Sequence, residues 1–139
     1  MASEFRTIRR VAFSETDMAG IMHFAHFFRW MEDAEHAFLR SLGFSVHQVI
    51  DGRTIGWPRV RAECEYHRPL RFEDEVEIEL RVREKRPKSL TYDFTFRTLQ
   101  GEAVARGSLT VVCAAIDASG RIGAIEIPPA MAAQIEPAP

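Results

Sequence analysis

The spacing of apolar residues changes once along this chain, and that change limits the folds open to it. Between Phe24 and Leu42 apolar side chains recur every three or four residues, which is the spacing of one helix face. From Ile55 onward apolar and polar residues alternate, as they do in strands with one buried face. We therefore expect an α+β domain in which one long helix, ending at Gly43, packs on an antiparallel sheet.

Shorter elements are expected on both sides of these two regions. The alternating segments around residues 60–66, 76–82 and 90–96 are joined by short turns typical of hairpins. The other expected elements are a first strand over residues 5–13, a short helix over 46–50 that stops at the Asp51-Gly52 turn, one long strand over 103–116, a short helix after Pro128-Pro129 and a loose end over 132–139.

Size and composition exclude several classes of protein. At 139 residues the chain fits a single domain, residues 1–139, that can bury a core without disulfides. Its net charge of −2, with both signs interspersed, favours neither nucleic acid nor an anionic membrane as a partner. No apolar run approaches the ~18 residues of a membrane-spanning helix, and the first residues lack a signal-peptide core. Cys64 and Cys113 lack metal-ligand spacing, so we expect reduced thiols in a cytoplasmic protein.

A single carboxylate, Asp17, stands just before the most apolar segment of the chain. A helix that begins near His23 or Phe24 would direct unpaired backbone N–H groups at the loop holding Asp17. Gly20 would let that loop approach a ligand closely. A carboxylate beside such donors has the two parts that acyl transfer needs, a nucleophile or base and an oxyanion site. Alternatively, Asp17 or Ser14 only caps the helix.

The stretch ETDMAGIMHFAHFFRWMEDA resembles the signature of the 4-hydroxybenzoyl-CoA thioesterase family of the hot-dog superfamily. That signature has an Asp, two variable residues, a Gly, an aliphatic pair and an aromatic-rich helix containing Arg-Trp. The matching positions are Asp17, Gly20, Ile21, Arg29 and Trp30. The likeness extends to RPKSL (86–90) and AIEIP (124–128), and so covers nearly the whole chain. It implies a hot-dog fold, in which the sheet wraps around the long helix.

The resemblance also implies a reaction. In the family the residue at Asp17 attacks the thioester carbonyl or activates water, and the backbone N–H at Phe24 polarises the carbonyl oxygen. Aspartate is a weak base at neutral pH, which favours direct attack, but both routes stay open. Coenzyme A is part of the substrate, so no separate cofactor is expected. Phe24 and Phe27 replace the polar side chains of some relatives, so an apolar acyl or aryl group fits as well as 4-hydroxybenzoyl.

Other residues are candidates for contacts with the substrate. His23 and His26 could contact the acyl group, and we expect no metal because a third ligand is missing and His36 is too far along the helix. In the family, the region of Trp57 and Pro58 lines the acyl pocket from a neighbouring subunit, although Trp57 could equally belong to the core.

Coenzyme A brings phosphates, which require cations near the mouth of the site. Candidates are Arg86 and Lys88 in the basic turn and, more weakly, Arg121, although a plain solvated turn is the alternative for the first two. The resemblance implies a homodimer, or a homotetramer of two dimers, because sheet edges need protection. Two other functions stay open, a non-catalytic acyl-CoA binding module and a hydroxyacyl-thioester dehydratase, which would need a His–acid pair. The acyl group and its carrier, CoA or acyl carrier protein, cannot be read from the sequence.

Overall fold

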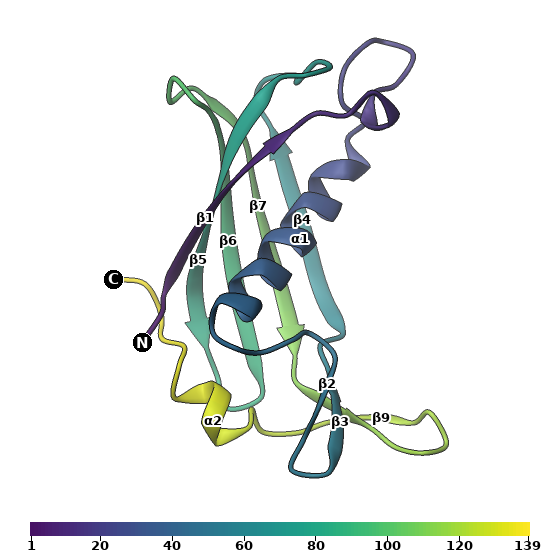
Figure 1. Cartoon of the computed structure of the whole chain (residues 1–139), viewed down its shortest axis with the longest axis vertical. Helices are drawn as coiled ribbons and strands as arrows, with labels where there is room; N and C mark the ends of the chain where they lie inside the picture. Colours follow the sequence, from purple (N-terminus) through teal and green to yellow (C-terminus); the bar gives the residue numbers. More distant parts are fainter.

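The computed structural model describes all 139 residues, and its centre is a five-stranded antiparallel sheet crossed by one long helix (Figure 1). The strand order is β1-β5-β6-β7-β4. The bounds are β1 (Glu4–Arg10), α1 (Ala25–Ser41), β4 (Arg59–Tyr66), β5 (Glu75–Lys85), β6 (Ser89–Thr98) and β7 (Ala103–Val112). The expected α+β architecture is confirmed.

The helix α1 forms where the three-and-four spacing placed it. Its buried positions are Phe27, Trp30, Met31, Ala34, Glu35, Phe38 and Leu39. It ends as expected at Gly43, which adopts a φ of +87° that costs a glycine little. The Phe44 N–H then donates to the Leu39 carbonyl at 2.9 Å, which closes the helix end.

The inner face of the sheet supplies the other half of the core. The alternating residues are buried as predicted: Val76, Ile78, Leu80 and Val82 on β5, and Leu90, Tyr92, Phe94 and Phe96 on β6. At Gly107 of β7 the helix comes very close, because a Cβ there would lie 2.5 Å from the Met31 sulfur. A larger residue at this position would therefore force the Met31 side chain to shift.

A second, smaller sheet lies at one end of the first, and its strand order is β2-β3-β8-β9. Its strands are β2 (Gln48–Ile50), β3 (Arg53–Gly56), β8 (Ala114–Ile116) and β9 (Ile122–Ala124). The prediction of a helix over 46–50 is wrong. Asp51 and Gly52 both have positive φ, 52° and 75°, which makes them a two-residue hairpin turn between β2 and β3.

Two further boundaries differ from the prediction. The long strand over 103–116 is interrupted at Cys113, whose N–H donates to the Lys88 carbonyl and whose own carbonyl accepts from Ile125, so the chain passes there from one sheet to the other. The first strand stops at Arg10, and a short 3-10 helix, η1 (Phe13–Glu15), follows it.

The C-terminal segment is fixed and not loose as predicted. After α2 (Pro129–Ala132), which begins behind Pro128 as expected, Ile135 is fully buried and the Ala2 N–H donates to the Gln134 carbonyl at 2.8 Å. The Lys85 ammonium donates to the carbonyls of Ala132 and Ile135 at 2.7 and 2.8 Å. No helix in the molecule is long and apolar enough to cross a membrane.

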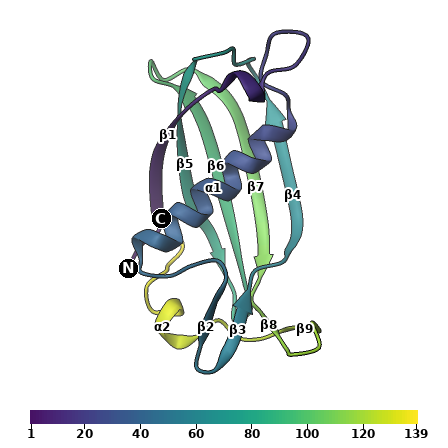
Figure 2. The same ribbon diagram turned by 45° about the vertical axis from the view of Figure 1, so that its right-hand side comes forward.

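The molecule has two distinct ends, and its main sheet has two edge strands, β1 and β4. The loop between η1 and α1 lies at one end, and the small sheet with α2 lies at the other (Figures 1 and 2). The strand β4 pairs only with β7, so its outer edge is free. Its apolar alternation predicted burial, but Val60 and Tyr66 are 63% and 44% exposed, because this edge strand is only partly covered by α1.

Candidate functional site

The loop before α1 is a tight hairpin that carries Asp17. At its base the His23 N–H donates to the Glu15 carbonyl at 2.9 Å, and further out the Asp17 N–H donates to the Ile21 carbonyl at 2.9 Å. Gly20 closes the tip with a φ of +79° and open space where a Cβ would stand. The pair of Glu15 and His23 directly precedes the helix. Asp17 therefore lies two residues, roughly 7 Å, further toward the hairpin tip than Glu15.

The Asp17 carboxylate has one held oxygen and one free oxygen. Its Oδ1 accepts from the N–H groups of Ala19 and Ile21 at 2.9 and 3.5 Å, whereas Oδ2 accepts no hydrogen bond from the protein. Neither Asp17 nor Ser14 caps α1, so the alternative of a simple helix cap is wrong. The carboxylate is half-buried and keeps one oxygen available for a ligand.

The helix start leaves one backbone donor without a partner. The helix begins at Ala25, whose N–H donates to Nδ1 of His23 at 3.2 Å, and the next N–H, of His26, donates to the His23 carbonyl at 3.0 Å. The N–H of Phe24 donates to no group in the protein. A free N–H at the positive end of a helix is suited to bind a developing negative charge.

Several aromatic side chains gather around Phe24. The Phe24 ring is 60% exposed and stacks on His23 with ring centres 4.6 Å apart. At the C-terminal end of β4, the Tyr66 hydroxyl donates to the Phe24 carbonyl at 3.1 Å. The centres of the Tyr66 and Phe27 rings lie 5.1 Å apart. The wall beside the free N–H is therefore apolar.

Cysteine and metal chemistry have little support at this site. Both cysteines are free, as expected, and burial raises the pKa of Cys64 and of Cys113 to about 11, so both remain thiols at neutral pH. The rings of His23 and His26 lie 6.1 Å apart, and no group of three or more His, Cys, Asp or Glu side chains is placed to hold a metal ion.

The other predicted site residues lie at the opposite end of the molecule. Trp57 and Pro58 precede β4, whereas Tyr66 ends it, so the eight residues of β4, roughly 25 Å, separate them from the start of α1. Trp57 is buried, and its indole N–H has no partner. One chain alone does not bring these residues to Asp17.

The predicted phosphate-binding cations are also far from Asp17. The strand β5 begins beside Arg10 at the η1 end and runs eleven residues, roughly 35 Å, before the turn that holds Arg86 and Lys88. Arg121 lies in the β8–β9 hairpin at that same far end. Arg86 pairs with Glu84, whereas Lys88 and Arg121 form no ion pair.

Sequence reasoning missed two carboxylates, Glu15 and Glu35, that bond to residues distant in the sequence. Glu15 accepts the Trp30 indole N–H, a partner fifteen residues away that no local pattern reveals. Glu35 is 0% exposed on α1, pairs through Oε1 with Arg59, and leaves Oε2 without a partner. Burial, the largest cause, raises the pKa of Glu35 to about 7. Its place on the apolar stripe, four residues after Met31, was the available signal.

Comparison with known proteins shows the family of this chain. The sequence matches the Thioesterase-like superfamily over residues 11–135. The chain belongs to that superfamily. Its sequence is 30% identical over 96 residues to a 1,4-dihydroxy-2-naphthoyl-CoA hydrolase of Prochlorococcus marinus, an alignment that covers 64% of each protein.

Solved structures agree with this assignment. A gentisyl-coenzyme A thioesterase is 34% identical, with a TM-score of 0.80 over 92% of this chain and 99% of that one. A 4-hydroxybenzoyl-CoA thioesterase solved with 4-hydroxybenzoyl-CoA has a TM-score of 0.81 over 96% of this chain and 99% of that one. At 23% identity the second likeness concerns the fold alone. The hot-dog fold and the family resemblance expected from the sequence are confirmed.

Proposed function

We propose that the chain hydrolyses acyl- or aroyl-CoA thioesters, with Asp17 as nucleophile or general base. The observation that carries this proposal is that the hairpin and the helix start directly after it leave two groups without a protein partner. They are the Phe24 N–H, which has no protein partner, and Oδ2 of Asp17, which accepts no hydrogen bond. A thioester carbonyl oxygen bound at the first would expose its carbon to the second.

The nucleophilic route proceeds in two steps. Oδ2 of Asp17 bonds to the carbonyl carbon, the C–S bond breaks, and CoA leaves as a thiolate that takes a proton from solvent. Water then attacks the resulting anhydride, which releases the carboxylic acid, returns one proton to solvent and restores the Asp17 carboxylate. In the alternative route Asp17 takes a proton from a water that attacks the thioester carbon directly; the C–S bond then breaks, and the leaving CoA thiolate takes up that proton. Both routes use the Phe24 N–H for the oxyanion, and Gly20 keeps the hairpin tip clear of a Cβ.

The walls of the site favour an acyl or aryl group with a large apolar surface. Phe24, Phe27 and Tyr66 form an aromatic wall beside the free N–H. The relatives named above act on gentisyl-CoA and 1,4-dihydroxy-2-naphthoyl-CoA, which makes aroyl thioesters the first substrates to test. His26 is the better candidate for a polar contact, since Nδ1 of His23 already accepts from Ala25.

A second copy of the chain would complete the site. The free edge of β4 can pair with β4 of another copy about a two-fold axis, and antiparallel pairing would reverse one copy relative to the other. The far end of the second copy, with its Trp57, Pro58, Arg86, Lys88 and Arg121, would then lie beside the first copy's helix start. We therefore infer a homodimer, or a homotetramer of two dimers, in the cytoplasm, and a reaction with no cofactor besides the CoA of the substrate.

Thiol release from a panel of acyl- and aroyl-CoA thioesters tests this function. The proposal expects turnover, fastest with an aryl or other bulky apolar group. Tight binding of every thioester without thiol release would instead indicate a binding module. Loss of water from a 3-hydroxyacyl-CoA without thiol release would indicate a dehydratase.

A further inference from the structure

Glu15 joins the Asp17 hairpin to α1 through its side chain. Its Oε2 accepts the Trp30 indole N–H at 2.7 Å, and its Oε1 accepts the Ala12 backbone N–H at 2.8 Å. The side chain is only 14% exposed; its bond to Trp30 is partly buried, whereas its bond to Ala12 is exposed. Trp30 lies in the second turn of α1 and is almost fully buried. One carboxylate therefore links the segment before the hairpin to the body of the helix.

The backbone of Glu15 also holds the hairpin. Its carbonyl accepts from His23, the residue before Phe24, and its N–H donates to the Ala12 carbonyl, both at 2.9 Å. Two residues further along the chain is Asp17. Glu15 thus lies two residues before the carboxylate that is proposed to react and is hydrogen-bonded to the residue before Phe24, whose N–H is proposed to bind the oxyanion.

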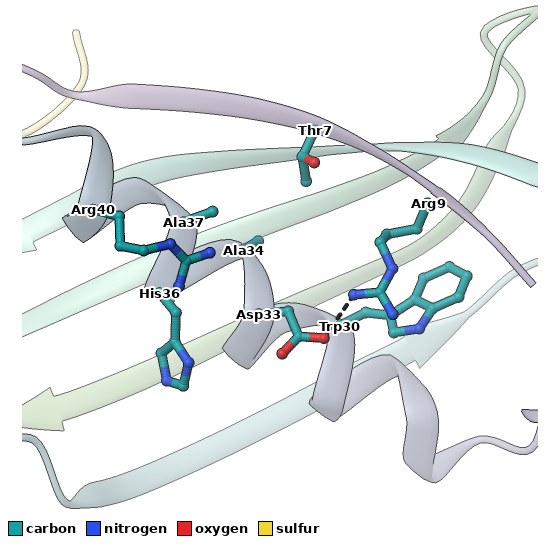
Figure 3. Close-up of a pocket in the computed structure, with 8 residues that line it drawn as sticks. All are labelled: Thr7, Arg9, Trp30, Asp33, Ala34, His36, Ala37 and Arg40. Carbon is teal, nitrogen blue, oxygen red and sulfur yellow. Dashed lines mark hydrogen bonds and ion pairs between the residues drawn. The ribbon is translucent and has the colours of Figure 1, made fainter. Parts of the chain in front are cut away.

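An arginine from β1 gives this mostly covered carboxylate its counter-charge. The guanidinium of Arg9 lies 3.9 Å from Oε2 of Glu15 and 5.1 Å from the centre of the Trp30 ring. Arg9 also donates to Asp33 of α1 at 2.6 Å, and Figure 3 shows Arg9 spanning from β1 to Trp30 and Asp33. The network therefore fastens β1, η1 and α1 to one another at a single point.

We propose that Glu15 is a positioning residue for the thioesterase reaction, acting on Asp17 and Phe24 and not on the substrate. This inference rests on the proposed function. Two N–H donors, from Ala12 and Trp30, converge on Glu15 and need two acceptor oxygens, which a carboxylate supplies. A glutamine supplies one acceptor and turns its NH₂ group against the other donor. The hairpin would then shift relative to α1, and a displacement near 1 Å at reacting atoms can cost ~100-fold in rate.

A double-mutant cycle of Glu15→Gln and Trp30→Phe tests this. Phenylalanine keeps the buried ring and removes the indole donor, so it relieves the conflict that glutamine creates. On the best substrate we expect kcat to fall ~10- to 100-fold in Glu15→Gln, with KM changed less than ~3-fold. Trp30→Phe should lose less activity, and the double variant should be no slower than Glu15→Gln alone. The matched control is Glu102→Gln, which removes an exposed ion pair with Arg68 and should keep kcat unchanged.

Two readouts separate positioning from plain structural support. Assays are run well below each variant's thermal midpoint, and the indole N–H signal of Trp30 is followed by NMR, assigned by its absence in Trp30→Phe. Positioning predicts that this signal moves in Glu15→Gln and that kcat falls while the folded protein still binds a non-hydrolysable acyl-CoA analogue. Unchanged kcat in both single variants, or strictly additive losses in the double variant, would overturn the inference. If Glu15→Gln does not fold, full kcat in Trp30→Phe has the same consequence. Wild-type protein that releases no thiol would instead refute the proposed function.

Discussion

Replacing Glu35 by glutamine should remove a large pH dependence from the stability of the protein. Glu35 is completely buried on α1, where Oε1 pairs with Arg59 and Oε2 has no partner. Burial raises the pKa of its carboxyl from 4.5 to about 7, against the opposing effect of Arg59. The folded protein therefore holds this proton more tightly than the unfolded chain does.

The size and sign of the contribution of Glu35 to the free energy of unfolding follow from the difference between its folded and unfolded pKa. The unfolded carboxyl ionises near 4.5 and the folded one near 7, and at ~1.4 kcal/mol per pH unit this amounts to about 3 kcal/mol. The contribution is fully present below pH 4.5 and is lost as the pH rises through 7. Glutamine cannot ionise, so the wild type should lose about 3 kcal/mol relative to Glu35→Gln between pH 4.5 and pH 8.

Urea unfolding of both proteins at several pH values measures this difference directly. Subtracting the two free energies of unfolding at each pH cancels the groups that titrate alike in both proteins. Glu102→Gln, which changes an exposed carboxylate, serves as the control and should give a nearly flat difference. A flat difference for Glu35→Gln as well, or one that rises with pH, would refute the assignment of a proton to Glu35.

Two other variants test the packing and the assembly. Gly107→Ala places a Cβ 2.5 Å from the Met31 sulfur and 3.2 Å from the Glu63 carbonyl, so we expect a loss of ~1–3 kcal/mol in urea unfolding; an unchanged midpoint would show that Met31 moves aside freely. Val60→Lys adds a charge to the free edge of β4, so light scattering should detect a shift toward monomer together with loss of thiol release; a fully active monomer would contradict the proposed dimer.

The sequence predicted best those elements in which the apolar pattern repeats many times. The helix stripe from Phe24 to Leu42 and the alternation on β5 and β6 each repeat several times, so one interpretation fits. The segment 46–50 is too short for its period to decide, and the Asp51-Gly52 pair that was read as a helix stop is a strong hairpin signal. The alternation on β4 was real, but the sequence does not reveal that this strand stands at an edge.

For the candidate site too, residues close in the sequence were predicted, whereas those whose role depends on the folded chain were not. Asp17, Gly20 and the helix start lie within eight residues, so local spacing was enough to group them. Glu15 was missed because its role depends on Trp30, which reaches it only after the chain has turned into the helix. Arg86 and Lys88 could be chosen by charge, but their distance from Asp17 follows from the direction of β5, which the pattern alone does not give.

The central claim is that Asp17 carries the hydrolysis, and Asp17→Asn tests it most directly. Asparagine keeps an oxygen that can accept from Ala19 and Ile21, so the hairpin should hold while the carboxylate is lost. Thiol release is measured on the best aroyl- or acyl-CoA of the panel, for the wild type and for the variant. The account predicts that kcat falls at least ~100-fold in Asp17→Asn with KM nearly unchanged. A variant that keeps the wild-type kcat would contradict it.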